Sequence, residues 1–126
     1  MESEKIGLNE QPTLLLIGNE PTLGYLLGRF AERCGYQLAL NLEDSSVRKI
    51  TAIKPAVIVF QSTEVLETNQ TLVGDLMSLD FPIIVCSSVA DETRARELGA
   101  DYCLLHPLVF DDFQMALTNA AASKRA

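Results

Sequence analysis

The chain alternates between short uninterrupted apolar runs and longer stretches in which apolar residues recur at helical spacing. Apolar runs of this length, rich in Val, Ile and Leu, are typical of strands that are buried on both faces of a parallel sheet. The second run alternates apolar and polar residues, which suits a position near the sheet edge. The predicted strands are Thr13–Ile17, Tyr36–Leu42, Pro55–Gln61, Phe81–Cys86 and Tyr102–Leu105.

An amphipathic stretch follows each run and predicts a helix. Pro21 suits the start of the first helix, and Gly35 and Gly99 suit the stops of the first and fourth. The predicted helices are Thr22–Cys34, Asp44 or Ser45 to Ile53, a helix after a loop within Thr63–Leu79, Asp91–Leu98, and Val109–Ala122 capped near Asp111. The predicted inner faces are Leu23, Leu26, Leu27 and Phe30; Val47, Ile50 and Ile53; Leu72, Val73, Leu76 and Met77; and Phe110, Phe113 and either Met115 or Leu117.

Strands that alternate with helices predict an α/β three-layer sandwich, in which a five-stranded parallel sheet has helices on both faces. We expect one domain over residues 13–122, with tails at 1–12 and 123–126. Ligands and reactive groups of such sheets lie beyond the carboxyl ends of the strands. These positions hold Gly18–Asn19, Gln61, Ser87 and His106.

Composition narrows the class of protein. The 126 residues are 48% hydrophobic, which suits one folded domain. The net charge of −7 argues against direct nucleic-acid binding, because affinity for phosphates depends on Lys and Arg. No apolar run reaches the ~20 residues that span a bilayer, so we expect no membrane segment. The 3 cysteines form no even framework, which predicts reduced thiols and a cytoplasmic location.

Four segments carry a resemblance to a known family, and they occur in the family's order: Leu14–Pro21, Lys54–Gln61, Phe81–Ser88 and Glu97–Pro107. Their sequence resembles that of the receiver domain of two-component response regulators, from about Thr13 to Ala122. The resemblance implies a flavodoxin-like fold with strand order 2-1-3-4-5.

The resemblance also shows where this chain departs from the family. It implies a phosphoacceptor aspartate at Gln61, an acidic magnesium-binding pair at Gly18–Asn19 and a lysine at His106, whereas the hydroxyl position is kept as Ser87. An amide cannot form an acyl phosphate, and magnesium prefers carboxylate oxygens. We therefore predict a degenerate pseudo-receiver without catalytic residues, metal or cofactor, in which His106 hydrogen-bonds to Gln61.

The family's switch and interaction surface are altered as well. The switch aromatic corresponds to Cys103, and the segment from Ser88 to Gly99 is about one helical turn shorter than usual. Receivers act through the face made by the fourth helix, fifth strand and fifth helix. That face would carry Arg94, Arg96, Glu97, Asp101, Tyr102, Asp111 and Asp112. We expect it to contact a protein partner, which is a kinase, an output domain or a second copy in a homodimer.

Two alternatives belong to other functional classes. The first is a small-ligand, nucleotide-type site at the same sheet edge, although Gly18-Asn19-Glu20-Pro21 lacks a glycine-rich phosphate cradle and carries an acid. The second is a serine hydrolase that uses Ser87 and His106, although no acid in the pattern orients the histidine.

Overall fold

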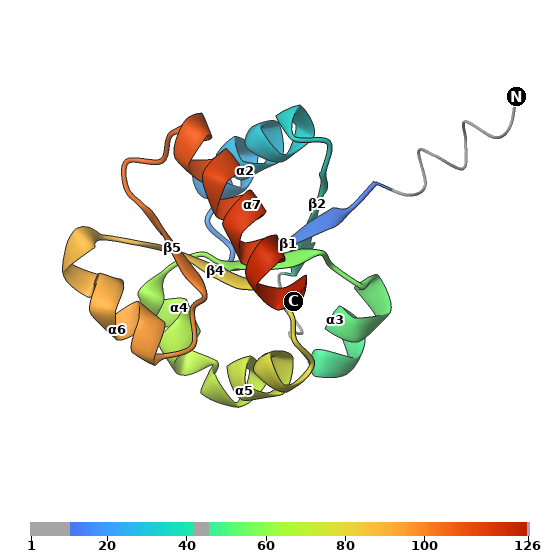
Figure 1. Ribbon diagram of the computed structural model, residues 1–126, viewed down its shortest axis with the longest axis vertical. Coiled ribbons are helices and arrows are strands. Elements are labelled where there is room, and N and C mark those ends of the chain that lie inside the picture. Colours follow the sequence, from blue (N-terminus) through green and yellow to red (C-terminus); the bar gives the residue numbers. More distant parts are fainter. Residues whose placement is uncertain (1–10, 42–45, 126) are drawn as a thin grey trace, which may run out of the picture.

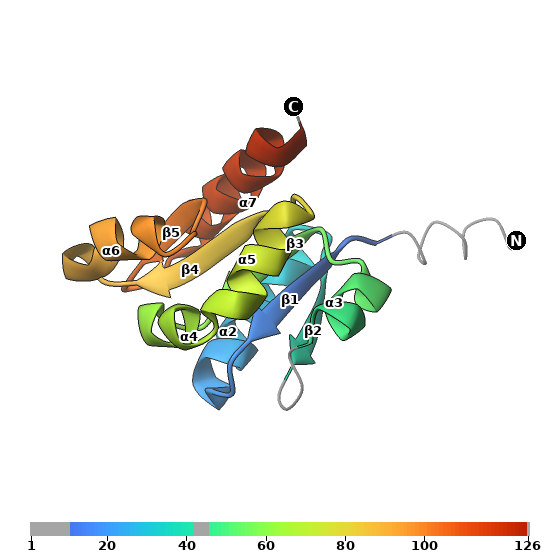
Figure 2. The same ribbon diagram turned by 90° about the horizontal axis from the view of Figure 1, so that it is seen from below.

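The five strands form one parallel sheet in the order β2-β1-β3-β4-β5. The computed structural model describes residues 11–41 and 46–125. The strands are β1 (Thr13–Ile17), β2 (Gln37–Asn41), β3 (Val57–Phe60), β4 (Ile83–Ser87) and β5 (Tyr102–Leu105). The predicted fold class and strand order are confirmed, and Figure 2 shows the strand arrows running toward the same end of the sheet.

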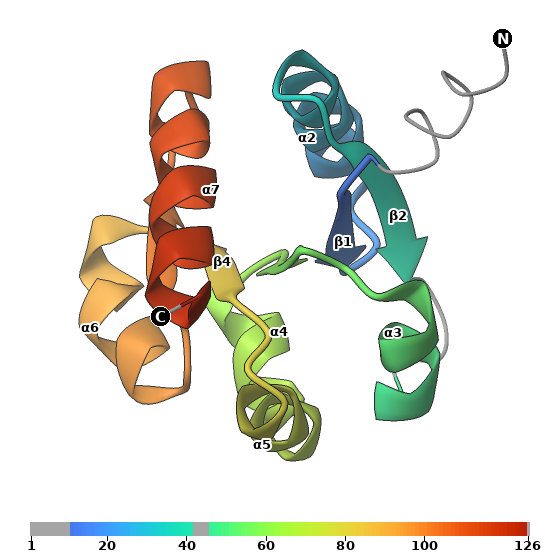
Figure 3. The same ribbon diagram turned by 45° about the vertical axis from the view of Figure 1, so that its right-hand side comes forward.

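Helices cover both faces of the sheet, which gives three layers (Figures 1 and 3). One face carries α2 (Pro21–Arg33) and α7 (Phe110–Arg125). The other carries α3 (Val47–Ile53), α4 (Thr63–Thr68), α5 (Gln70–Ser78) and α6 (Glu92–Glu97), with a short 3₁₀ turn η1 (Val89–Asp91) before α6. No helix in the described ranges is long and apolar enough to cross a bilayer.

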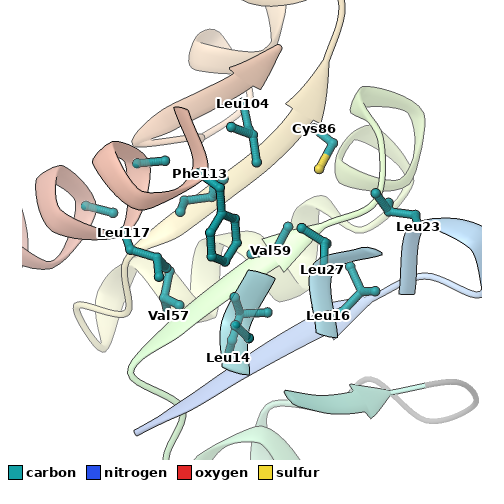
Figure 4. Close-up of a cluster of buried hydrophobic side chains, with 14 residues drawn as sticks. Leu14, Leu16, Leu23, Leu27, Val57, Val59, Cys86, Leu104, Phe113 and Leu117 are labelled. Carbon is teal, nitrogen blue, oxygen red and sulfur yellow. The ribbon is translucent and has the colours of Figure 1, made fainter. Parts of the chain in front are cut away.

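The central strands are buried on both faces, which explains their unbroken apolar sequences. Leu14 and Leu16 of β1 point to the α2/α7 layer, whereas Leu15 and Ile17 point to the opposite layer. Figure 4 shows the first of these two cores, where Phe113 from α7 packs over the sheet.

The predicted third helix is in fact two helices, and its expected leading loop is helical. Ser62 begins α4 because its Oγ accepts a hydrogen bond from the Val65 N–H at 3.2 Å. Asn69 ends α4 because its Nδ2 donates to the Val65 carbonyl at 2.7 Å. The polar residues that suggested a loop are thus capping residues of a short helix.

Several helix ends differ from the prediction. Ser46 caps α3, through a hydrogen bond from the Lys49 N–H to its Oγ, whereas the predicted caps Asp44 and Ser45 lie outside the described residues. Helix α7 begins at Phe110, so Asp111 lies in its first turn, and the helix continues beyond the predicted end at Ala122 to Arg125.

Three apolar residues predicted to face the sheet are exposed, namely Ile53, Met77 and Met115. A helix contacts a sheet along a narrow stripe, and small residues bring α7 close to it. Ala116 and Ala120 fill that stripe together with Phe113 and Leu117, which leaves Met115 at the flank. Of the two residues predicted for the inner face of this helix, Met115 or Leu117, the structure confirms Leu117.

Candidate functional site

Gln61 and Gly18 meet at the carboxyl ends of the two central strands β3 and β1. Ile17 pairs with Phe60 in the sheet register, so the residues that follow these two strands lie side by side. The Gln61 backbone N–H donates to the Ile17 carbonyl at 3.0 Å, which carries the pairing of the strands one residue further.

The side chain of Gln61 holds the loop between β1 and α2. Its Oε1 accepts hydrogen bonds from the backbone N–H groups of Asn19, at 2.7 Å, and Glu20, at 3.0 Å. Glu20 in turn caps α2, because its Oε1 accepts from the Leu23 N–H at 2.7 Å. Backbone donors next to a helix N-terminus favour an oxygen acceptor, and here a neutral amide of the chain itself supplies it.

Gly18 is required by this arrangement. Its φ of +147° is rarely adopted by residues with a side chain. A Cβ built on Gly18 would lie 2.3 Å from Oε1 and 2.4 Å from Cβ of Gln61. The sequence indicated only that Gly18 lacks a metal ligand. The structure adds that the Gln61 side chain occupies the space that a side chain at position 18 would need. A glycine after one central strand and a long side chain after the next could have suggested this contact.

The residues at this edge do not fit the divalent cation that the receiver fold implies. Gly18 offers no ligand, the Asn19 N–H points to Gln61, and the Glu20 carboxylate caps a helix. Across the described ranges, no group of three His, Cys, Asp or Glu side chains could hold a metal ion. Magnesium needs several hard oxygen ligands in octahedral geometry, which this set does not supply.

Ser87 and Cys103 form a second pair, on one face of β4 and β5. Ser87 is only 3% exposed, and its Oγ donates to the Ser88 carbonyl at 3.1 Å. Cys103 Sγ donates to the Glu92 carbonyl at 3.8 Å. Burial raises the pKa of the Cys103 thiol, whereas the positive charge of Arg96 acts in the opposite direction. The structure therefore places Ser87 and Cys103 on the same face of two neighbouring strands, which is the geometry expected for the hydroxyl and switch positions.

The His106 side chain joins neither pair. It is exposed, and within the described part of the chain no hydrogen bond reaches it. The expected hydrogen bond to Gln61 is not formed among the described residues, where Gln61 Oε1 accepts from Asn19 and Glu20 instead. Only the backbone of His106 meets Ser87, with its N–H donating to the Ser87 carbonyl at 3.1 Å, and its peptide bond to Pro107 is cis.

The charged residues predicted for the interaction face are partly used inside the domain. Arg94 forms an ion pair with Glu67 of α4, and Arg96 Nη2 lies 3.3 Å from Glu92 Oε2. Asp101 Oδ2 accepts a hydrogen bond from the backbone N–H at the start of β4 at 2.9 Å. Tyr102 is half-buried, and the exposed acidic residues of the face are Glu97, Asp111 and Asp112.

Solved structures with a similar fold include receiver domains and response regulators. The response regulator receiver domain protein from Clostridium thermocellum superposes with a TM-score of 0.68 at 18% identity, covering 90% of this chain and 97% of that one. The signal receiver domain of a modulated diguanylate cyclase from Desulfovibrio desulfuricans G20 gives 0.69 at 17%, covering 92% and 98%. A response regulator from Thermotoga maritima gives 0.70 at 13%, covering 89% and 98%.

No protein-family model matches the chain, and no curated protein matches its sequence. The similarity to solved structures therefore shows the fold, which is that of a receiver domain.

Proposed function

We propose that this protein is a receiver-like signalling module of a two-component or related pathway, which is not phosphorylated and acts through protein–protein contacts. The observation that supports it best is the position of the Gln61 side chain, which fills the space beside Gly18 and bonds to both N–H groups of the loop. A receiver without a nucleophile at this point has no residue there to accept a phosphoryl group.

The replacement is coordinated rather than confined to one residue. The amide of Gln61, the glycine at position 18 and the capping role of Glu20 support one another, because each depends on the conformation of the same loop. A return to phosphorylation would therefore need a new loop conformation as well as a new carboxylate.

The proposed partner is a protein: a kinase, an output domain or a second copy of this chain. Helix α6, strand β5 and helix α7 would supply the contact, with Glu97, Asp111 and Asp112 as its exposed acidic residues. Basic side chains on the partner would complement them. We place this activity in the cytoplasm, where free thiols such as Cys86 and Cys103 remain reduced.

The two alternative functions receive less support. Ser87 is buried and bonded to its neighbour, whereas His106 is exposed, so the two do not form a nucleophile–base pair. A nucleotide at the edge of the sheet would bring its phosphates to the loop that carries Glu20, where a negative charge opposes them.

Phosphorylation is tested with acetyl phosphate and with beryllofluoride plus magnesium. We expect no covalent labelling of the wild-type chain or of Gln61→Asp, and no rise in melting temperature with magnesium and beryllofluoride. A receiver that retains its aspartate serves as the positive control. Stable labelling of Gln61→Asp, or a clear magnesium-dependent rise in melting temperature, would contradict the proposal.

The interaction is tested by light scattering and by pull-down of candidate kinases and output domains. Asp111→Lys with Asp112→Lys should weaken the contact at least tenfold, or about 1.4 kcal/mol. Asp75→Lys, an exposed acidic change on α5, is the matched control. Equal effects of the two changes would count against this face.

A further inference from the structure

A hollow of about 650 Å³ lies beside the β1–α2 loop, between α2 and the edge strand β2. Hollows of this size are typical of small-molecule sites in proteins, which span about 300–1,000 Å³. Its lining residues are Leu16, Gly18, Asn19, Glu20, Pro21, Gly24, Tyr25 and Leu40. We call it the α2–β2 hollow, and Figure 3 shows the helix and the strand that form its walls.

Most of the lining is apolar. Leu16 lies beneath it at 2% exposure, whereas Leu40 is 50% and Tyr25 is 67% exposed at its sides. Arg29 holds the Tyr25 ring in place, because its Nη1 donates to the Tyr25 hydroxyl at 2.8 Å. The hollow thus offers an aromatic ring and two leucines to a ligand.

Gly24 keeps the α2–β2 hollow open. It lies within α2 and has no positive φ, so the backbone does not require glycine there. A Cβ on Gly24 would sit 3.9 Å from Cδ2 of both Leu16 and Leu40, in ordinary contact. Glycine in a helix interior costs about 1 kcal/mol relative to alanine. Gly24 therefore lowers the stability of the helix although a larger side chain would fit. This is explained if a ligand uses the space.

The polar residues of the lining restrict what can bind. Asn19 and Glu20 lie at the end next to the loop. None of the described residues lining the hollow carries a positive charge, and the neighbouring Arg29 guanidinium is already bonded to the Tyr25 hydroxyl. A phosphate or carboxylate there would be repelled by Glu20. An N–H donor, in contrast, could bond to the amide oxygen of Asn19 and to Oε2 of Glu20, because only Oε1 of Glu20 is engaged in capping α2.

We propose that the α2–β2 hollow binds a small planar nitrogen heterocycle or aromatic amidine without an anionic group. Its ring would lie against Leu16, Leu40 and Tyr25, with its N–H donors directed to Asn19 and Glu20. This proposal goes beyond the signalling function and does not depend on whether the chain is phosphorylated.

The test uses two matched pairs of probes, benzamidine with benzoate and adenine with AMP. Titrations are followed by the methyl signals of Leu16 and Leu40 in ¹H–¹³C NMR spectra. We expect benzamidine and adenine to shift both signals with dissociation constants of about 1 mM or lower, and their anionic counterparts to bind at least tenfold more weakly.

Two variants separate this site from non-specific binding. Gly24→Leu should fill the hollow and abolish the shifts. Gly74→Leu places the same side chain in α5, where a Cβ meets nothing within 4 Å, and should leave binding unchanged. Thermal melts of both variants establish that they are folded. The proposal is overturned if neither benzamidine nor adenine binds, if the anions bind equally well, or if a folded Gly24→Leu retains binding.

Discussion

A single methyl group added at Gly18 should destabilise the whole domain. Two features of the structure oppose it. The residue has φ +147°, and the new Cβ would lie 2.3 Å from Oε1 and 2.4 Å from Cβ of Gln61. The Oε1 atom could rotate away, but the Cβ of Gln61 is fixed to the backbone directly after β3. The clash between the two Cβ atoms can therefore be relieved only if the β1–α2 loop moves.

The expected cost of Gly18→Ala is about 2–5 kcal/mol. The unfavourable φ contributes about 1–2 kcal/mol for a residue with a Cβ. Overpacking against Gln61 contributes about 1–3 kcal/mol. Such a loss is a large fraction of the 5–15 kcal/mol that stabilises a typical domain.

The assay is urea unfolding followed by circular dichroism, since the chain has no tryptophan. Gly74→Ala is the matched control, because its Cβ meets nothing within 4 Å and alanine is the better helix former. It should be neutral or up to about 1 kcal/mol more stable. The double variant with Gln61→Gly separates the two causes, because removing the Gln61 side chain relieves the clash and leaves the cost of φ.

Two results would refute this reasoning. If Gly18→Ala costs under about 0.5 kcal/mol, the loop adapts freely and the contact with Gln61 does not constrain it. If the cost is large but shows no coupling to Gln61→Gly, the strain lies in the backbone alone, and the Gln61 side chain is not what requires glycine at position 18.

Three further predictions follow from hydrogen bonds and burial. Gln61→Ala should lower the free energy of unfolding by about 1–2 kcal/mol and speed hydrogen exchange of the Asn19 and Glu20 amides. Gln61→Glu should keep both hydrogen bonds, because a carboxylate oxygen can accept them, and equal exchange in the two variants would contradict this. Burial raises the pKa of the Cys86 thiol from 9.0 to about 12, so its contribution to stability is complete below pH 9 and falls as pH rises toward 12. By pH 11 the wild-type chain should lose about 2–3 kcal/mol of unfolding free energy more than Cys86→Ala does, as measured by urea unfolding. Parallel plots of unfolding free energy against pH for the two chains would argue against this. Asp101→Ala should cost about 1–2 kcal/mol because the first N–H of β4 loses its acceptor, while Asp112→Ala, on the exposed side of α7, should cost almost nothing in the same assay.

The strands were predictable because burial on both faces leaves an unmistakable apolar pattern. Leu14–Ile17 and Val57–Phe60 contain no polar residue, and their neighbours in the sheet follow from the alternation with helices. Short helices were harder. Ser62 and Asn69 are common in loops, and only their hydrogen bonds to Val65 show that they cap α4 at its two ends.

At the candidate site, the sequence predicted which residues follow the ends of the strands but not which contacts their side chains make. It placed Gln61 and His106 at the same edge of the sheet, where a hydrogen bond between them was reasonable. Which partner Gln61 uses depends on a side-chain torsion and on the φ of Gly18, and neither follows from the order of residues. The sequence offered the Gly18–Pro21 loop as part of a small-ligand site, but it did not predict the α2–β2 hollow beside that loop, because Tyr25 and Leu40 come from separate segments.

The amide of Gln61 has a consequence for how such a module could carry information. An acceptor that is part of the chain is present at a fixed ratio of one per molecule, and it neither accumulates nor decays as a phosphoryl group does. The conformation of the loop is then set when the protein is synthesised. A signal would pass through it by mass action, in proportion to the amounts of the protein and its partner, and would persist until one of them is degraded or diluted by growth.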